Sequence, residues 1–258
     1  MNTDKLWQAL SQYTEARIGL GKVGVSQPTA AQLKFQLDHA RARDAVWTAL
    51  DCDSLVAELS AAGLTSVVLH SQVADRAAYL TRPDLGRQLN PQSVSCLQQM
   101  PAAEVVLVVA DGLSTIAVQQ NAAQMISRLC QLHCLKEKCF APVVIVEQGR
   151  VAVGDAVGEL LRAELVIVLV GERPGLSAAN SLGMYLTYRP KTGCTDADRN
   201  CISNIRPGGL SFEQAATKAE YLIDQFLIRK ISGVQIKDNS DERVLEASTQ
   251  TGSDQRLT

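Results

Sequence analysis

Short apolar runs alternate with helix-like segments through the middle of the chain, and this alternation predicts the architecture. The apolar runs, rich in β-branched residues, cover 66–69, 105–109, 143–146 and 165–170. Segments of helical composition lie between them, at 91–99, 116–130 and 155–163. Runs of this kind are typical of strands covered on both faces. The pattern therefore predicts an α/β fold with a doubly wound, mostly parallel sheet of Rossmann-like type.

The two ends of the chain have different patterns. A short amphipathic helix is expected over 3–16, a long helix over 28–50 and a closing helix over 212–231. The stretch from Pro174 to the closing helix is interpreted as a long connection, of a kind that is more often functional than a plain linker. We therefore expect three parts, namely an N-terminal helical segment (1–62), an α/β domain (63–236) and a polar, disordered tail (237–258).

Charged side chains follow three of the predicted strands. Asp111 follows the second strand, Arg150 the third, and Glu172 with Arg173 the fourth. Because parallel strands share one carboxyl edge, and ligands of such sheets gather there, we expect these four residues around one rim. Structural roles are the alternative, with Asp111 as a turn or capping residue and the Glu172–Arg173 pair closing a turn.

Composition narrows the class of protein. The 258 residues include 25 basic and 27 acidic side chains, a balance that does not indicate nucleic-acid binding. The longest apolar runs span about half a dozen residues, well below the roughly 20 that a membrane-spanning helix needs. No secretory signal is seen at the N-terminus, so we expect a cytoplasmic protein whose seven cysteines are reduced.

Several catalytic and cofactor motifs are missing. The chain has no P-loop, no nucleophile elbow and no glycine fingerprint after a strand; the Gly19-x-Gly21-x-x-Gly24 match has no strand before it. Cys201 could be a nucleophile, but no base for it can be identified. We therefore predict no catalytic residue in this chain, and a binding role in which a cofactor or another polypeptide supplies the chemistry.

Cys130, Cys134 and Cys139 with His133 suggest a metal cluster at first sight. Their spacing lacks a Cys-x-x-Cys pair and no second ligand pair follows. We therefore predict no metal site.

Five motifs in the same order, from about Arg17 to Lys237, resemble the small (light) subunit of ethanolamine ammonia-lyase. They are Gln36–Asp44, Tyr79–Arg87, Ala110–Ser114, Gly171–Leu176 and Arg199–Ile205. The resemblance implies a cobalamin-dependent lyase that converts ethanolamine to acetaldehyde and ammonia. It also implies a hetero-oligomer, in which this subunit covers adenosylcobalamin on one side and a TIM-barrel large subunit holds the substrate on the other.

By the same resemblance, three positions contact the cobalamin. These are Val151, Glu172 and Cys201, and two of them follow strands of the predicted sheet. Glu172 would accept N–H groups of the corrin amides, Val151 would pack on the cofactor, and Cys201 would be a contact and not a cobalt ligand. The chain lacks an Asp-x-His-x-x-Gly motif, which agrees with a family that keeps dimethylbenzimidazole on cobalt.

The resemblance also bears on location. Enteric members of the family carry a longer N-terminal extension, associated with packaging into a bacterial microcompartment. Here the matching region starts near residue 17, so plain cytoplasmic residence is favoured over encapsulation.

Two other functions remain open from the sequence. A nucleotide-dependent oxidoreductase would suit a doubly wound sheet, although it would need the missing glycine fingerprint. A non-enzymatic interaction protein could use the charged cluster from Asp38 to Asp44, which is otherwise interpreted as a solvated helix face.

Overall fold

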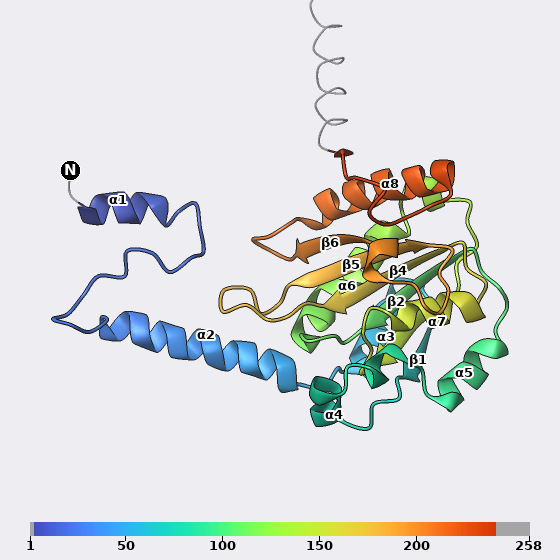
Figure 1. Ribbon diagram of the computed structural model, residues 1–258, viewed down its shortest axis with the longest axis horizontal. Coiled ribbons are helices and arrows are strands. Elements are labelled where there is room, and N and C mark those ends of the chain that lie inside the picture. The colour runs from blue at the N-terminus through green and yellow to red at the C-terminus, as the bar shows by residue number, and fades with distance from the viewer. Residues whose placement is uncertain (1–2, 241–258) are drawn as a thin grey trace, which may run out of the picture.

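The computed structural model describes residues 3–240 and is built around one six-stranded sheet (Figure 1). The strand order is β1-β3-β2-β4-β5-β6; β1 to β4 are mutually parallel, and β5 and β6 are antiparallel to their neighbours. The strands are β1 (Ser66–His70), β2 (Val105–Ala110), β3 (Val143–Glu147), β4 (Leu165–Gly171), β5 (Leu182–Tyr188) and β6 (Asn200–Ile205). The predicted mostly parallel α/β sheet is confirmed, and the four predicted strands are β1 to β4.

Helices connect and cover these strands. The α-helices are α1 (Thr3–Leu10), α2 (Thr29–Trp47), α3 (Cys52–Ala61), α4 (Arg76–Thr81), α5 (Pro91–Gln98), α6 (Thr115–Leu129), α7 (Val153–Leu160) and α8 (Phe212–Arg229). Single 3₁₀ turns lie at η1 (Leu85–Arg87), η2 (His133–Leu135) and η3 (Asp196–Asp198). Side-chain oxygens of Asn90, Ser114 and Ser211 accept main-chain N–H groups at the starts of α5, α6 and α8, which sets where these helices begin.

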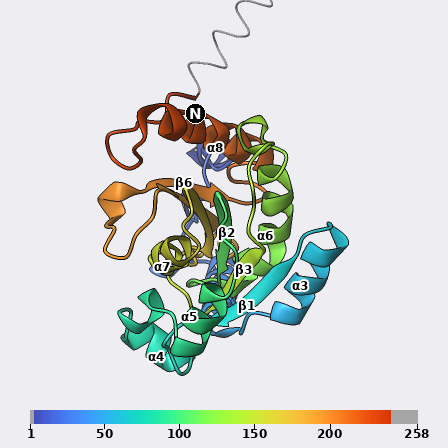
Figure 2. The same ribbon diagram turned by 90° about the vertical axis from the view of Figure 1, so that its right-hand side faces the viewer.

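Two apolar layers pack on the sheet. Every residue of β2 and β4 is buried, and alternate side chains point to opposite faces. Val105, Leu107 and Val109 belong to the core shared with α3, α6 and α8, whereas Val106 and Val108 belong to the core shared with α5 and α7. Figure 2 shows α3 and α6 on one side of the sheet and α5 and α7 on the other. Coverage of both faces explains why these strands are continuous apolar runs.

The stretch after Pro174, interpreted as a long connection, contains β5 and β6, so this interpretation was wrong. β5 pairs with β4 from Leu165↔Tyr188 to Gly171↔Leu182, and β6 pairs with β5 at the edge of the sheet. In β6 only Ile202 and Ile205 are buried. An edge strand that buries so few side chains lacks the apolar run by which the other strands were predicted.

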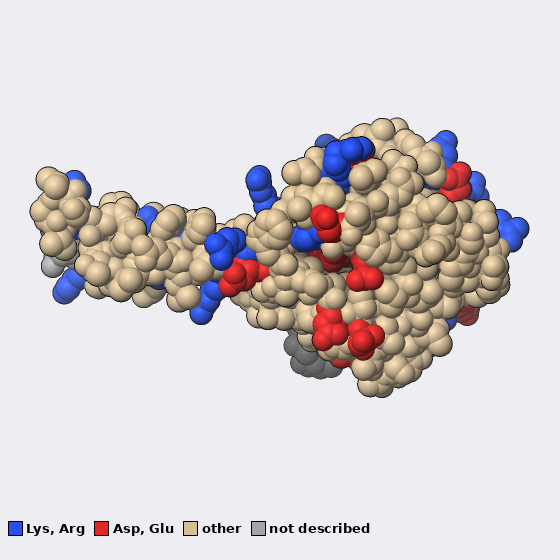
Figure 3. Space-filling view, turned by 90° about the horizontal axis from the view of Figure 1, so that it is seen from below, with Lys and Arg blue, Asp and Glu red and all other residues tan. Residues whose placement is uncertain are grey.

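The N-terminal helices form an arm that extends away from the sheet (Figures 1 and 3). In α2 only Asp38 and Ala45 are buried, and apolar side chains such as Leu33 and Leu37 are exposed. The cluster from Asp38 to Asp44 is therefore a solvated face except for Asp38, whose carboxylate pairs with Arg17 at 2.9 Å and with Lys34 at 3.1 Å. The expectation of a fully solvated cluster was thus wrong for Asp38.

At the C-terminal end, Ile236 and Ser240 are buried against the body. The remainder of the predicted tail, from 241 to 258, lies outside the described residues. No helix in the described part of the chain is both long and apolar enough to cross a membrane.

Candidate functional site

The connections of the sheet create a crevice at its carboxyl edge. After β2 the chain crosses through α6 to β3 on one face, and after β3 it crosses through α7 to β4 on the other. The segments that follow the neighbouring strands β2 and β3 therefore leave toward opposite faces of the sheet, and such a switch point is where open α/β sheets bind ligands.

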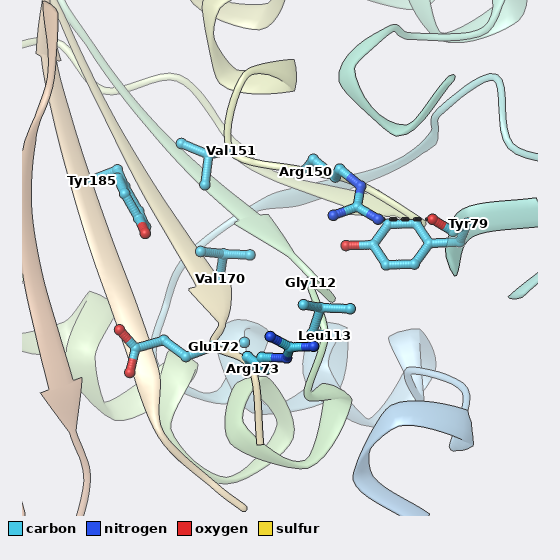
Figure 4. A pocket seen from close by; sticks show the side chains of 10 residues that line it. Tyr79, Gly112, Leu113, Arg150, Val151, Val170, Glu172, Arg173 and Tyr185 are labelled. Carbon is cyan, nitrogen blue, oxygen red and sulfur yellow. Dashed lines mark hydrogen bonds between the residues drawn. The ribbon is translucent and has the colours of Figure 1, made fainter. Parts of the chain in front are cut away.

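A cavity of about 420 Å³ lies at this point (Figure 4). Three of its walls are the turn after β2, the turn after β3, and the end of β4 with the two residues that follow it. Helix α4 and strand β5 each contribute a tyrosine. The lining residues are Tyr79, Gly112, Leu113, Arg150, Val151, Val170, Gly171, Glu172, Arg173 and Tyr185. Of the four residues predicted at one rim, Arg150, Glu172 and Arg173 line this cavity, and Asp111 does not.

A second hollow of about 710 Å³ adjoins the first. Arg150, Val151 and Tyr185 line both hollows, so the two adjoin along these residues; together they are called the groove. The second hollow continues past the start of α7 to the 192–196 loop and to Arg87 on η1.

Asp111 lies beneath the cavity, only 2% exposed. Its carboxylate accepts the main-chain N–H groups of Gln148 and Gly149, both at 3.0 Å, and pairs with Arg76 at 3.4 Å. Burial raises the pKa of Asp111 to about 6, and the Arg76 charge and the N–H donors oppose this shift. Asp111 thus ties the end of β2 to the turn that carries Arg150. Its role is structural, but it does not cap the following helix, which Ser114 does.

Tyr79 is held between two guanidinium groups. The carbons at the centres of the Arg76 and Arg150 guanidinium groups each lie 4.4 Å from the centroid of the ring. The Tyr79 hydroxyl donates to the Gly149 carbonyl oxygen at 3.2 Å, and burial raises the pKa of Tyr79 to about 12. The phenol therefore stays protonated at neutral pH and acts as a fixed platform.

Glu172 stands on the β5 side of the cavity (Figure 4). One carboxylate oxygen, Oε2, accepts the hydroxyl of Ser181 and the main-chain N–H of Asn204, the latter at 3.2 Å. The other oxygen, Oε1, accepts no hydrogen bond from the described residues and can accept one from a ligand. The strand-end spacing predicted this position. Ser181, just before β5, and Asn204 on β6 supply the groups that orient the side chain.

Cys201 lies on β6 directly across from Tyr185 of β5. Val151 and Glu172 line the cavity, whereas Cys201 lies one strand beyond its wall. The atoms packed around its sulfur raise the pKa of the Cys201 thiol, although the residue as a whole is exposed. A thiol with a raised pKa is a poor nucleophile at neutral pH, which argues against the nucleophile alternative.

The sequence reasoning missed Tyr79 and Tyr185 as cavity residues. Tyr79 begins one of the family-like motifs but lies on α4, a helix too short to show a clear period. Tyr185 lies in the stretch interpreted as a connection. Within residues 3–240, His, Cys, Asp and Glu side chains form no group of three that could hold a metal ion.

Comparison with known proteins agrees with the motifs. The family model described as "Ethanolamine ammonia-lyase light chain (EutC)" matches residues 4–237. An ethanolamine ammonia-lyase small subunit from Xanthomonas campestris pv. campestris is 51% identical over 248 residues, covering 94% of this chain and 91% of the relative. Small subunits from Pseudomonas putida and Ralstonia nicotianae are each 50% identical, covering 94% and 95% of this chain and 91% and 93% of those proteins. The chain therefore belongs to the ethanolamine ammonia-lyase small-subunit family.

Proposed function

We propose that this chain is the small subunit of an adenosylcobalamin-dependent ethanolamine ammonia-lyase and holds cobalamin against the catalytic large subunit. The observation that carries the proposal is the groove at the carboxyl edge of the sheet, which brings Val151 and Glu172 together and has Cys201 beside its wall. When bound, adenosylcobalamin supplies the homolytic radical chemistry that converts ethanolamine to acetaldehyde and ammonia.

The residues present fit such a cofactor. A corrin is an apolar ring with carboxamides at its periphery, so it needs an apolar surface flanked by hydrogen-bonding groups. Leu113, Val151 and Val170 supply apolar surface, and Glu172 Oε1 is an acceptor without a partner among the described residues. The Nε atom of Arg150 is a buried donor that has no partner in the described part of the chain. A buried donor without a partner, such as this Nε atom, is costly unless a ligand completes it.

Each residue then has a task in binding. Glu172 accepts an amide N–H of the cofactor, Val151 packs against its apolar surface, and Cys201 makes a further contact at the edge. No residue of this chain takes part in bond making, which is the work of a TIM-barrel large subunit. The chain positions the cofactor and keeps water from its covered face.

The proposal also assigns cofactor binding to one part of the chain and a location to the assembly. Cofactor binding belongs to the α/β domain (63–236), a doubly wound sheet of Rossmann-like type, and not to the N-terminal helical segment (1–62). We place the assembly in the cytoplasm, with a bacterial microcompartment as the alternative location.

Replacement of Glu172 tests the proposal. Glu172→Ala removes the acceptor that faces the cavity, so we expect cobalamin binding to weaken by about 1.5–3 kcal/mol, the value of a charge-assisted hydrogen bond. The measurement is a visible-absorption titration of the chain in complex with the large subunit. Glu137→Ala, at an exposed site outside the cavity, is the matched control.

Thermal unfolding of the same variants separates binding from folding. An unchanged Kd with a lowered Tm would show that Glu172 is structural and would contradict its binding role. A wild-type complex that stays colourless through gel filtration would favour a non-enzymatic interaction protein, and tight NAD binding would favour the oxidoreductase.

A further inference from the structure

We infer that Arg150 is the anion-binding residue of this groove and that it binds the phosphodiester of the cofactor's nucleotide loop. The inference rests on the proposed function and assigns one chemical group of the cofactor to one side chain. The charge of Arg150 is not neutralised by an ion pair with any residue from 3 to 240.

Arg150 differs from the well-buried arginines of this chain. Arg76, Arg199 and Arg206 each pair with a carboxylate, at 3.4, 2.6 and 2.8 Å. Within residues 3–240, Arg150 forms no ion pair. Its Nη2 donates to the Tyr79 carbonyl oxygen at 2.8 Å, and its buried Nε has no acceptor. A guanidinium with a buried free donor and no counter-charge is an incomplete site.

The side chain is also held in place before any ligand binds. The guanidinium of Arg150 stacks on the Tyr79 ring, and the main-chain N–H of Arg150 donates to the Gly86 carbonyl oxygen at 2.8 Å. Tyr79 is itself fixed by Arg76 on its other face and by its bond to Gly149. Because Arg150 is already ordered, little conformational entropy is lost when it binds an anion.

The groups around the cavity are divided by charge. Figure 4 shows the Arg150 guanidinium across the cavity from the carboxylate of Glu172. Arg173 adds a second cation that has no ion pair among the described residues. Glu172 is suited to the N–H side of neutral amides, whereas the Arg150 side presents donors and, among the described residues, no carboxylate paired with Arg150. An anion satisfies the Arg150 side better than a neutral amide does, because it balances the positive charge and can accept two parallel N–H bonds from one guanidinium.

Position favours the phosphodiester as that anion. Arg150 lines both hollows, so it lies where a ligand that fills one continues into the other. In cobalamin the phosphodiester is the anionic group that links the corrin side chain to the nucleotide base. The planar guanidinium fork matches two phosphate oxygens at once. This geometry puts the corrin on the Glu172 side and the nucleotide loop toward the 192–196 loop.

The test compares two corrinoids on the complex of this chain with the large subunit. Adenosylcobinamide keeps the corrin and its amides but lacks the nucleotide loop and its phosphodiester. Arg150→Met should raise the Kd for adenosylcobalamin by about 10- to 100-fold, the range expected for a hydrogen bond to a charged group. The Kd for adenosylcobinamide should change by less than about 3-fold, since Met leaves the amide contacts in place.

Two variants act as controls. Arg150→Lys keeps the charge without the fork and should restore part of the affinity for adenosylcobalamin. Arg128→Met removes a surface arginine paired with Glu213 and should change neither Kd. Thermal unfolding of each variant verifies that the fold is kept.

The outcomes are separable. An equal loss of affinity for both corrinoids in a folded Arg150→Met variant would overturn the assignment, because Arg150 would then serve the corrin amides or the shape of the groove. No loss for either corrinoid would overturn it as well. If the wild-type complex bound neither corrinoid, the proposed function itself would fail, whatever the role of Arg150.

Discussion

Asp111 lies at the end of β2, where two main-chain N–H groups and the Arg76 guanidinium converge on its carboxylate. Arg76 in turn donates to the carbonyl oxygens of Gly112 and Val46, at 2.9 and 2.6 Å. This pair of residues therefore joins the turn after β2, the turn after β3 and the end of α2. The position of Arg150 in the groove depends on that network.

Replacing Asp111 tests the network. In Asp111→Asn an amide nitrogen must face at least one of the three donors that the carboxylate now accepts. We expect a loss of about 1–3 kcal/mol in the free energy of unfolding, the cost of a buried donor left unpaired. The measurement is thermal unfolding of Asp111→Asn, with Asp44→Asn, at an exposed site on α2, as the control. Equal stability of the two variants would contradict this account.

The stability difference between wild type and Asp111→Asn should also depend on pH, in a direction set by the pKa of Asp111. Burial raises the pKa of Asp111 from the ordinary 3.8 to about 6, so the folded chain holds this proton more tightly than the unfolded chain. The stability contributed by Asp111 is therefore present below about pH 4 and is lost as pH rises through about 6. The margin of wild type over Asp111→Asn should narrow across that range, and a constant margin would argue against the raised pKa.

At the scale of elements, the cavity depends on how closely the end of β4 approaches the turn after β2. A Cβ atom placed on Gly171 would overlap the main-chain oxygen of Ser114, and Gly112 has a positive φ of 61° beside the same contact. Glycine at these two positions lets the β2 turn lie against the last residue of β4. The motifs Ala110–Ser114 and Gly171–Leu176 are thus two sides of one junction.

Gly171→Ala should force this junction apart. Overpacking of a well-packed site costs about 1–3 kcal/mol, and we expect a loss of that size in the free energy of unfolding. Gly175→Ala is the control, because a Cβ there meets its nearest atom at 3.8 Å, an ordinary contact distance. Chemical denaturation of both variants gives the comparison. A Gly171→Ala variant as stable as wild type would show that the junction can relax.

Elements differed in how well the sequence predicted them, for a physical reason. β2 and β4 bury every side chain, so their apolar runs identified them, and the residues that follow them led to Glu172 and Arg173. β6 buries two side chains and carries polar residues on its exposed face, so its pattern resembles that of a loop. The stacking of Arg150 on Tyr79 joins the turn after β3 to α4 across the fold, and no local pattern records it.

At the scale of the whole molecule, the arm and the sheet body are separable. Among the residues that the structure describes, neither of the two apolar cores includes one before Leu50. Contacts of the arm with the body are polar or terminal, such as the ion pair between Glu15 and Arg206 at 2.8 Å and the bond from Arg76 to Val46. Stability of the body should therefore depend little on the apolar side chains of α2.

Leu33→Ser combined with Leu37→Ser tests this separation. Leu33 and Leu37 are 59% and 50% exposed, so we expect the free energy of unfolding to change by no more than about 0.5 kcal/mol. Leu55→Ala, at a fully buried site on α3, should cost about 2–5 kcal/mol in the same thermal melts. A large loss in the double variant would mean that the arm is part of the cooperative unit.

The two walls of the groove differ in how they are attached. β5 is paired with β4 along its full length, so moving it would break a ladder of main-chain hydrogen bonds. The opposite wall, from α4 to η1, meets the β3 turn through single bonds, such as those from Tyr79 to Gly149 and from Arg150 to Gly86. Displacing the α4 side would break isolated bonds, whereas displacing β5 would break a continuous ladder. We therefore expect the groove to adapt to a bulky ligand on its α4 side.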